Sequence, residues 1–311
     1  MELISGYDLL VITGPTASGK TSLAVGVAKK VDGEIISADS RQVYRGMNLG
    51  TGKDYDDYEI DGTMVTCHLI DIVDPGYKYN VFEFQRDFIK VYTSLRECKV
   101  FPVVCGGSGM YIDSVITGYK MFEVPPDSGL RMKLEKKSLE ELRAILSTYK
   151  NPHNTTDLEN KKRLIRAIEI AHFDNNKGKS KVENPKIRSL VVGVMLERDS
   201  RRKRISERLI QRLNQGMVDE VKQLIDEGIS TEVLIYYGLE YKYITLYLTG
   251  KLSYDEMVRD LEIAIHQFAK RQMTWFRGME KRGIKIHWID GELANEEKVL
   301  RVMELLKDGG D

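Results

Sequence analysis

Residues 8–30 contain the pattern that most constrains the fold of this chain. Residues 8–13 (DLLVIT) are a short apolar run with β-branched side chains, and a Gly-Pro pair follows immediately. This pattern predicts a buried strand that runs into a turn. Residues 21–30 are predicted to form a helix after that turn. A strand, a glycine-containing turn and a helix in this order are typical of α/β domains.

The turn matches the phosphate-binding pattern G-x-x-x-x-G-K-[ST] in the context that the pattern requires. It consists of Gly14, Pro15, Thr16, Ala17, Ser18, Gly19, Lys20 and Thr21. The glycines let backbone N–H groups curl around an oxyanion, and the helix N-terminus adds its dipole. Lys20 can neutralise phosphate charge, and the Thr21 hydroxyl can hold Mg²⁺. The pattern predicts binding of a di- or triphosphate and does not specify the reaction.

Further strands are expected at residues 34–38, 100–105 and 188–196, with a helix within residues 81–97. Strands that alternate with helices predict a parallel sheet with ligands at the carboxyl ends of its strands. The predicted fold class is therefore α/β, with a P-loop-type parallel sheet flanked by helices. Three later helices are expected at residues 201–213, 217–227 and 253–278, the last beginning with a capping box formed by Ser253 and Glu256.

Residues 122–160 differ in character from the rest of the chain. Pro125 and Pro126 break the chain, and helical patterns rich in Lys and Glu follow. We therefore expect an all-helical insertion at residues 122–160 that contacts the partner macromolecule. The catalytic core with its C-terminal helices is then expected at residues 1–121 and 161–311.

The composition is that of an ordinary globular protein, with 42% hydrophobic and 30% charged residues. No apolar run approaches the roughly 18 residues that a spanning helix needs, so we expect no membrane association. The first residues lack a basic start and a long apolar stretch, so no signal peptide is expected. The three cysteines, Cys67, Cys98 and Cys105, have no metal-ligand spacing. A reducing cytoplasm is the expected location.

The formal net charge is zero, but the charges are distributed unevenly along the chain. Residues 32–87 carry 12 acids and 5 bases, whereas residues 161–212 carry 16 bases and 6 acids. A basic block can bind a polyanion, because Lys and Arg displace the counterions of phosphates. The simpler alternative is a solvated helical face, and the charge pattern alone leaves both possibilities open.

Residues 37–53 (SADSRQVYRGMNLGTGK) follow the second predicted strand and resemble the tRNA dimethylallyltransferase family closely. The resemblance continues at residues 68–71 (HLID) and 106–111 (GGSGMY). It resumes at residues 162–169 (KRLIRAIE) and 269–277 (AKRQMTWFR). These blocks run in family order over nearly the whole chain, so their combination is far more specific than the phosphate-binding pattern alone.

This resemblance implies transfer of a dimethylallyl group from dimethylallyl diphosphate to the N6 amine of a tRNA adenosine, with release of diphosphate. The adenosine would be the one 3′-adjacent to the anticodon. Catalysis then requires stabilisation of the departing diphosphate by Lys20, the loop amides and Mg²⁺. The family similarity places Thr16 and Arg208 beside this leaving group as catalytic residues. Taken without the family, Arg208 belongs to a basic stripe that could simply face solvent.

The adenine amine is a poor nucleophile, because its lone pair is delocalised into the ring. A carboxylate that accepts its proton as the C–N bond forms can overcome this. The resemblance gives this role to Asp39 at the end of the second predicted strand. The alternatives for Asp39 are a helix N-cap or an anchor for Mg²⁺. Asp71 could be a metal-side carboxylate or a turn residue, and we favour the turn.

The resemblance also implies a surface for the tRNA anticodon stem-loop. The implied tRNA-binding residues are Asp39, Ser40, Arg41, Gln42, Ser108, Arg131, Lys162, Arg163, Leu164, Ile165, Arg166, Tyr237, Gly238, Leu239, Glu240, Tyr241 and Lys242. Glu240 departs from the family pattern, which usually has Gly there, and puts a carboxylate where phosphates would approach. We expect the protein to act as a monomer.

Three other functions would also use a phosphate-binding loop. A small-molecule kinase explains the loop and the sheet, but not residues 39–53 or the basic block. A prenyltransferase that acts on free adenine nucleotides shares the donor, but a mononucleotide needs no extended basic surface. A non-catalytic RNA-binding protein with a relic loop is disfavoured, because Lys20, Thr21 and Asp39 are all present.

Overall fold

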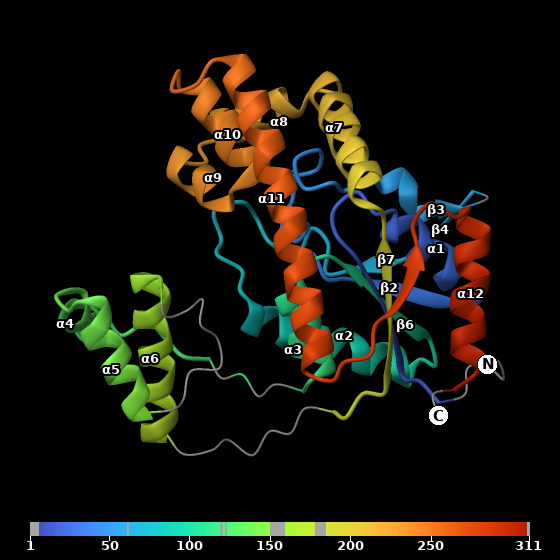
Figure 1. The fold of residues 1–311 in the computed structure, drawn as a ribbon, viewed down its shortest axis with the longest axis horizontal. Helices are drawn as coiled ribbons and strands as arrows, with labels where there is room; N and C mark the ends of the chain where they lie inside the picture. The colour runs from blue at the N-terminus through green and yellow to red at the C-terminus, as the bar shows by residue number, and fades with distance from the viewer. Residues whose placement is uncertain are drawn as a thin grey trace. The chain divides into compact units, whose positions relative to one another are not determined.

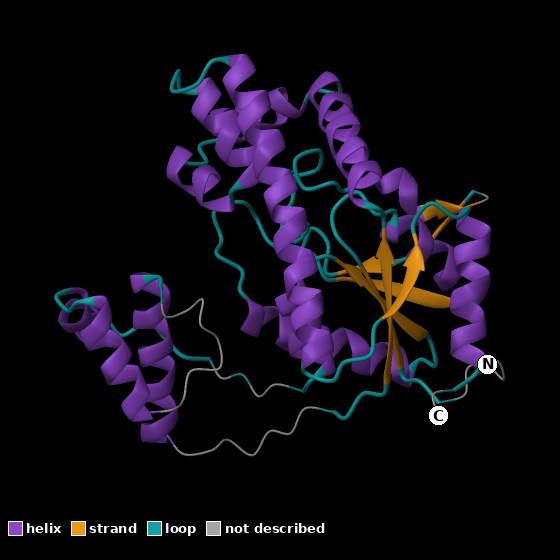
Figure 2. Ribbon diagram, in the orientation of Figure 1, coloured by secondary structure: helices purple, strands orange, loops and turns teal. Residues whose placement is uncertain are grey.

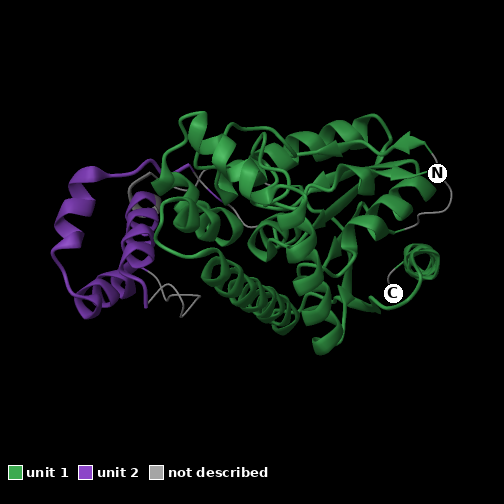
Figure 3. Cartoon of the chain, turned by 90° about the horizontal axis from the view of Figure 1, so that it is seen from above, with its two compact units in different colours: residues 1–119, 185–311 green, residues 120–184 purple. Residues whose placement is uncertain are grey.

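The computed structural model describes residues 6–60, 62–118, 121, 123–149, 159–177 and 185–309, without the side chains of residues 174–177. The chain forms two compact units (Figure 3). The larger unit comprises Met1–Tyr119 and Pro185–Asp311, and the smaller one comprises Lys120–Asn184. Among the described residues, no helix has both the length and the apolar character needed to cross a membrane.

Within the described residues of the larger unit, six strands form one sheet in which all neighbouring strands are parallel. Across the sheet they are β5 (Cys67–His68), β2 (Gly33–Ser37), β6 (Phe101–Gly106), β1 (Leu9–Thr13), β7 (Ser189–Met195) and β8 (His287–Asp290). The four predicted strands are confirmed, whereas β5 and β8 were not predicted. Because the strands are parallel, their carboxyl ends meet at one edge, where a ligand can bind.

Helices cover both faces of this sheet (Figures 1 and 2). Successive side chains of β1 point to opposite faces, so that Leu10 and Ile12 pack in one apolar core while Leu9 and Val11 pack in the other. The helices that contribute to these two cores include α1 (Lys20–Lys30), α2 (Val81–Glu97), α3 (Gly109–Ile116) and α12 (Asn295–Lys307). Burial on both sides explains why the strands are continuous apolar runs.

A bundle of C-terminal helices joins the core on the α2 and α3 side. Its members are α7 (Arg198–Asn214), α8 (Met217–Asp226), α9 (Thr231–Tyr237), α10 (Leu239–Leu248) and α11 (Tyr254–Lys281). The predicted helices after β7 are confirmed, and Gly216 separates α7 from α8 with a φ of 99°. Ser253 and Glu256 form the predicted capping box at the start of α11. The small elements η1 (Tyr55–Tyr58), β3 (Glu59–Ile60) and β4 (Thr63–Met64) complete this unit.

The described part of the smaller unit is helical, as expected for the insertion. It contains α4 (Ser128–Glu135), α5 (Leu139–Tyr149) and α6 (Lys161–Lys177). The predicted boundary at residue 160 differs from this division, because α6 belongs to the insertion and not to the core. The reason is that Leu164 and Ile168 of α6 pack against Leu142 and Leu146 of α5 in one separate apolar cluster.

Candidate active site

The phosphate-binding pattern forms a tight loop between β1 and α1. Ala17 and Gly19 have φ angles of 63° and 82°, in the left-handed region. A side chain at Gly14 would come within 2.5 Å of the Val194 carbonyl oxygen, so only glycine fits there. Helix α1 begins at Lys20, and the unpaired N–H groups of its first turn lie next to the loop. The loop therefore has the backbone geometry and the helix dipole that bind an oxyanion.

Lys20 is partly buried in this loop, and its Nζ donates a hydrogen bond to the Pro15 carbonyl at 3.4 Å. Loss of solvation lowers the pKa of Lys20, although nearby Asp39 acts in the opposite direction. A cation that is partly stripped of water gains most from a bound anion. Lys20 is thus placed to bind phosphate, and Asp39 lies close enough to interact with it.

Arg208 of α7 donates a hydrogen bond to the side-chain oxygen of Thr16. Loss of solvation, followed by repulsion from Arg212, lowers the pKa of Arg208 to about 10. Arg212, one helical turn further along, is buried and pairs with Asp54 at 2.7 Å. The basic stripe on α7 therefore faces the loop at this point instead of solvent. The structure brings Thr16 and Arg208 together, as the family resemblance implies.

Gln272, which sequence reasoning missed, fixes the loop from the opposite side. It is 7% exposed, and its Oε1 accepts a hydrogen bond from the Thr16 backbone N–H at 2.9 Å. Its Nε2 donates to the Gly107 carbonyl at 2.9 Å. A side chain at Gly107 would come within 2.4 Å of this nitrogen, which explains the glycine. The signal was available, because Gln272 lies inside the family block at residues 269–277.

Replacement of Gln272 with Met is expected to weaken pyrophosphate binding by about tenfold, because a buried amide and carbonyl lose their partners. Met keeps the volume of the side chain and removes both hydrogen bonds. Titration calorimetry with pyrophosphate measures the effect. Gln267→Met, at an exposed position of the same helix, is the matched control. Equal affinities in the two variants would contradict a role for Gln272 in holding the loop.

Asp39 lies just past the carboxyl end of β2, at the same edge as the loop. Its Oδ1 accepts a hydrogen bond from the Arg41 backbone N–H at 2.9 Å, which closes a turn. No helix follows Asp39, so the helix N-cap alternative is wrong. Among the described residues, no hydrogen bond to its second oxygen is found, which leaves that oxygen able to accept a proton.

The residues that follow Asp39 are held against the end of β6. The Ser40 N–H donates to the Ser108 hydroxyl oxygen at 3.0 Å. Gln42 accepts from the Ser37 hydroxyl at 3.0 Å and donates to the Gly52 carbonyl at 3.1 Å. The predicted positions from Asp39 to Gln42 and Ser108 therefore form one cluster at the carboxyl edge of the sheet.

Asp71 is a structural residue in this region. It has a φ of 53°, and its carboxylate accepts hydrogen bonds from the Lys53 ammonium and the Tyr55 hydroxyl. Both carboxylate oxygens accept hydrogen bonds from protein donors, which favours the turn role over a role as a metal ligand.

Residues 237–242 comprise the last residue of α9, Gly238 and the first turn of α10, and both tyrosines among them are buried. The Tyr237 hydroxyl accepts from the Gly76 N–H at 2.6 Å, and the Tyr241 hydroxyl donates to Glu220 at 2.7 Å. Both tyrosines are buried, so their side chains stabilise the fold. Any contact of this segment with a large partner therefore involves its backbone or its partly exposed side chains.

Glu240 lines a small cavity together with Arg208 and Arg212. Loss of solvation raises the pKa of Glu240, whereas the two arginines lower it. The carboxylate of Glu240 therefore lies beside two positive charges close to the loop. Lys242, two residues on, lies over the Tyr243 ring at 4.8 Å from its centroid.

In the smaller unit, the predicted tRNA-binding residues fall into three groups. Arg131 and Arg166 both pair with the buried carboxylate of Glu169, at 2.7 and 3.2 Å. Leu164 and Ile165 are buried in the core of this unit, so their side chains cannot contact a partner. The exposed residues Lys162 and Arg163 remain as charges that a partner can reach.

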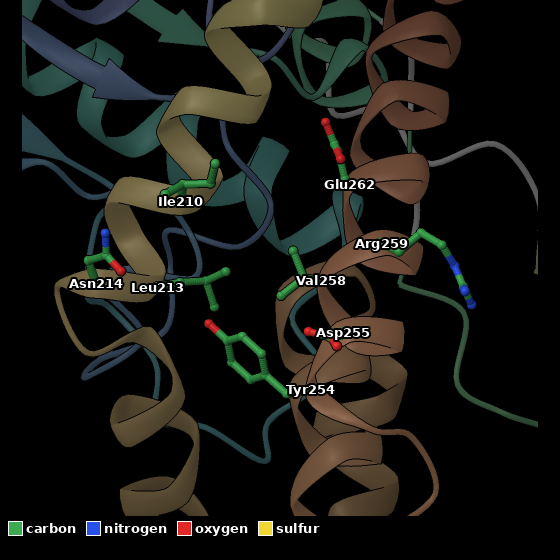
Figure 4. A pocket seen from close by; sticks show the side chains of 8 residues that line it. All are labelled: Ile210, Leu213, Asn214, Tyr254, Asp255, Val258, Arg259 and Glu262. Atoms are coloured by element: carbon green, nitrogen blue, oxygen red, sulfur yellow. The ribbon is translucent and has the colours of Figure 1, made fainter.

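A larger groove lies away from the loop, between α7 and α11 (Figure 4). Its volume is about 390 Å³, and its apolar lining comes from Ile210, Leu213, Tyr254 and Val258. Neither the phosphate-binding loop nor Asp39 lines it, so it is separate from the candidate active site.

Comparison with known proteins agrees with this geometry. The family model "IPP transferase" matches residues 42–279, and "Isopentenyl transferase" matches residues 7–68. A tRNA dimethylallyltransferase 2 of Phocaeicola vulgatus is 59% identical over 96% of this chain and 98% of its own length. A tRNA dimethylallyltransferase 1 of Parabacteroides distasonis is 53% identical over 98% of this chain and 99% of its own length.

Solved structures give the same result. The full-length tRNA isopentenylpyrophosphate transferase of Bacillus halodurans superposes with a TM-score of 0.71 and 32% identity, over 97% of this chain and 96% of its own. A eukaryotic dimethylallyltransferase acting on tRNA has the same fold, with a TM-score of 0.78 and 19% identity over 97% of this chain and 80% of its own. The chain therefore belongs to the IPP transferase family, which includes the tRNA dimethylallyltransferases.

Proposed function

We propose that this protein transfers the dimethylallyl group of dimethylallyl diphosphate to the N6 amine of the adenosine 3′-adjacent to the anticodon in tRNA. The observation that carries the proposal is the meeting of three features at one edge of the sheet. These are the loop with Lys20, the contact between Arg208 and Thr16, and the carboxylate of Asp39. An anion site and a proton acceptor side by side suit a reaction that releases diphosphate and deprotonates an amine.

The proposed function of the loop is to stabilise the departing diphosphate. C1 is the carbon of the dimethylallyl group that is bonded to the diphosphate. As the bond from C1 to the diphosphate oxygen breaks, negative charge grows on that oxygen and its phosphoryl group. Lys20 and the loop amides stabilise this charge, and Arg208 adds a second cation on the side of Thr16. Donors that are fixed in advance typically contribute about 10²–10³-fold in rate each, because they need no reorganisation. The contact of Gln272 with the loop keeps these donors in place.

A divalent cation, Mg²⁺, fits the residues present at the loop. Mg²⁺ binds through one or two protein oxygens together with substrate phosphates and waters. The Thr21 hydroxyl, in the first turn of α1, is such an oxygen. No group of three or more acidic, His or Cys side chains that could hold a metal occurs among the described residues, so phosphates would complete the site. When bound, the cation supplies further neutralisation of the diphosphate.

The proposed function of Asp39 is to accept a proton from the N6 amine of the acceptor adenosine. The N6 nitrogen forms a bond to C1 as the C1–oxygen bond breaks, and its proton moves to the free oxygen of Asp39. The electron pair of the broken bond leaves with the diphosphate, so that charge and atoms balance. The Arg41 N–H holds the other oxygen of the carboxylate at 2.9 Å and orients it. General-base catalysis of this kind contributes about 10²–10⁴-fold.

The tRNA must present its adenine unstacked, because a stacked base cannot reach the donor. We infer that Lys162 and Arg163 bind phosphates of the anticodon stem-loop, since both are exposed on α6. Arg131 and Arg166 help mainly by fixing the helices of the smaller unit through Glu169. We further propose that the protein acts as a monomer in the cytoplasm.

Replacement of both Lys162 and Arg163 with Ala is expected to weaken tRNA binding and to lower its salt dependence. The log–log slope should fall by about 0.7–0.9 per lost phosphate contact. Filter binding at several salt concentrations measures the slope, and pyrophosphate affinity should not change. The matched control is the double replacement of Lys133 and Lys136, which are exposed charges of the same unit. An equal slope in both double variants would show that α6 faces away from the tRNA.

The proposed function is tested directly with labelled dimethylallyl diphosphate. Transfer of label to tRNA, and not to AMP or ATP, is the expected result. Label on free nucleotides would identify a nucleotide prenyltransferase instead. Phosphorylation of a small molecule from ATP, with no transfer of label, would indicate a kinase.

A further inference from the structure

Helix α12 packs along α1, close to the phosphate-binding loop. The Asn295 Nδ2 donates a hydrogen bond to the Ser22 carbonyl at 3.1 Å. A side chain at Gly26 would come within 2.8 Å of a Val299 methyl, so the two helices are in close contact. This packing places the first turn of α12 beside the first turn of α1.

Lys298 lies on this first turn of α12, and it is 6% exposed. Among the described residues, its ammonium forms neither a hydrogen bond nor an ion pair. Its positively charged neighbour Arg204 is itself paired with Glu292 at 2.7 Å. Loss of solvation, followed by repulsion from Arg204, lowers the pKa of Lys298, although the nearby acids Asp290, Glu292 and Glu296 act in the opposite direction. The stem of Lys298 is thus enclosed by the fold, while its ammonium has no hydrogen-bond or ion-pair partner and is left able to bind an anion.

The ammonium of Lys298 lies next to the loop. A methyl group placed on Gly19 would be 3.8 Å from Lys298 Nζ. Gly19 immediately precedes α1, at the positive end of the helix dipole. A second positive charge at this end is repelled by the dipole unless an anion lies between them. The site therefore has two converging positive sources, the α1 N-terminus and the unpartnered Lys298.

We propose that Lys298 binds a phosphoryl oxygen of the diphosphate, as a second lysine contributed by the C-terminal helix. Arg208 contacts the loop at Thr16, and Lys298 lies beside Gly19, at the other end of the loop. Cations at both ends suit a ligand with two phosphoryl groups better than one with a single group. Lys298 is thus a determinant of affinity for diphosphate over orthophosphate. The naming of the ligand as the donor's diphosphate rests on the proposed function.

Inorganic pyrophosphate tests this proposal without the reaction. Lys298→Met keeps the apolar stem and removes the charge. We expect its dissociation constant for pyrophosphate to rise by about tenfold or more, with a smaller rise for orthophosphate. The variant without ligand should melt at the same or a higher temperature, because a partly desolvated charge that Arg204 repels is removed. A lysine with a purely structural role would show the opposite, a lower melting temperature with unchanged affinity.

Two further variants define the comparison. Lys298→Arg keeps the charge and should retain most of the preference for pyrophosphate. Lys307→Met removes an exposed charge from the same helix and should have no effect. The proposal is overturned if Lys298→Met binds pyrophosphate like the unmodified protein. An equal loss in Lys307→Met would overturn it as well, since it would point to net charge alone.

Chemical labelling of the unmodified protein keeps the test valid if a variant fails to fold. Acetic anhydride reacts with neutral lysine amines, and mass spectrometry gives the extent of reaction at each site. Pyrophosphate should slow acetylation of Lys298 and leave Lys307 unchanged, and equal rates at Lys298 with and without it would reject the proposal. Because no tRNA is present, failure here is distinct from failure of the transfer assay, which alone tests the proposed function.

Discussion

Asp39→Asn is expected to lower kcat by about 10²–10⁴-fold while KM for tRNA changes little, because only the transition state uses proton acceptance. The amide oxygen of Asn can still accept the hydrogen bond from the Arg41 N–H, so the turn is kept. Single-turnover kinetics at saturating donor measure the chemical step. Asp74→Asn, at a side chain that is 80% exposed, is the control and should keep a normal rate.

The same experiment at two Mg²⁺ concentrations separates the remaining roles of Asp39. If Asp39 anchored the metal, excess Mg²⁺ would restore much of the rate. If it only held the turn, Asn would serve almost as well, and turnover per folded molecule would stay near normal. A near-normal rate at both concentrations would show that Asp39 is not the base.

Lys20→Ala is expected to have the second large effect, a loss of about 10²-fold or more in turnover with much weaker pyrophosphate binding. The reason is that a partly desolvated counter-charge to the leaving group is removed. Titration calorimetry with pyrophosphate and a steady-state assay with dimethylallyl diphosphate measure the two effects. Lys30→Ala, at an exposed position near the end of α1, is the control.

The effect of Lys20→Ala on the melting temperature also tests whether Lys20 serves ligand binding and not stability. Burial lowers the pKa of Lys20 in the folded state, so folding disfavours the charged amine. This destabilisation is present when the amine is protonated, which includes neutral pH, and it disappears as the pH rises through the unfolded-state pKa. Lys20→Ala should therefore not lower the melting temperature of the free protein at pH 7. Unchanged affinity and rate would contradict the assignment of the loop.

The parts of the fold that the sequence predicted well are those determined by local pattern. The strand, turn and helix at residues 8–30 follow from apolar runs and glycine spacing, and so does the capping box of α11. The short strands β5 and β8 have only 2 and 4 residues, too few for a periodic signal, and their pairing with the sheet decides their conformation. The role proposed for Arg208 came from family resemblance, because its helix alone is equally compatible with a solvent face.

The sequence was less informative about which surface a side chain faces, as the predicted tRNA-binding residues of α6 and the missed Gln272 show. In residues 162–166 of α6, two exposed charges are followed by the buried side chains of Leu164 and Ile165, so a contiguous block of the sequence does not form a contiguous surface. Gln272 contacts the loop and Lys298 lies beside it only because α11 and α12 fold back onto the loop. No local pattern in the chain reveals such contacts.

The hydrogen bond from Thr16 to Gln272 joins residues that are 256 positions apart. Contacts of such separation form only after most of the chain has been brought together, because closing long loops costs entropy. During synthesis, the glycine-rich segment therefore emerges from the ribosome long before the glutamine that fixes its shape. A nascent chain that ends before residue 272 has the complete motif without its support. We therefore expect tight diphosphate binding only from the finished protein, so that this binding can serve as a probe of completed folding.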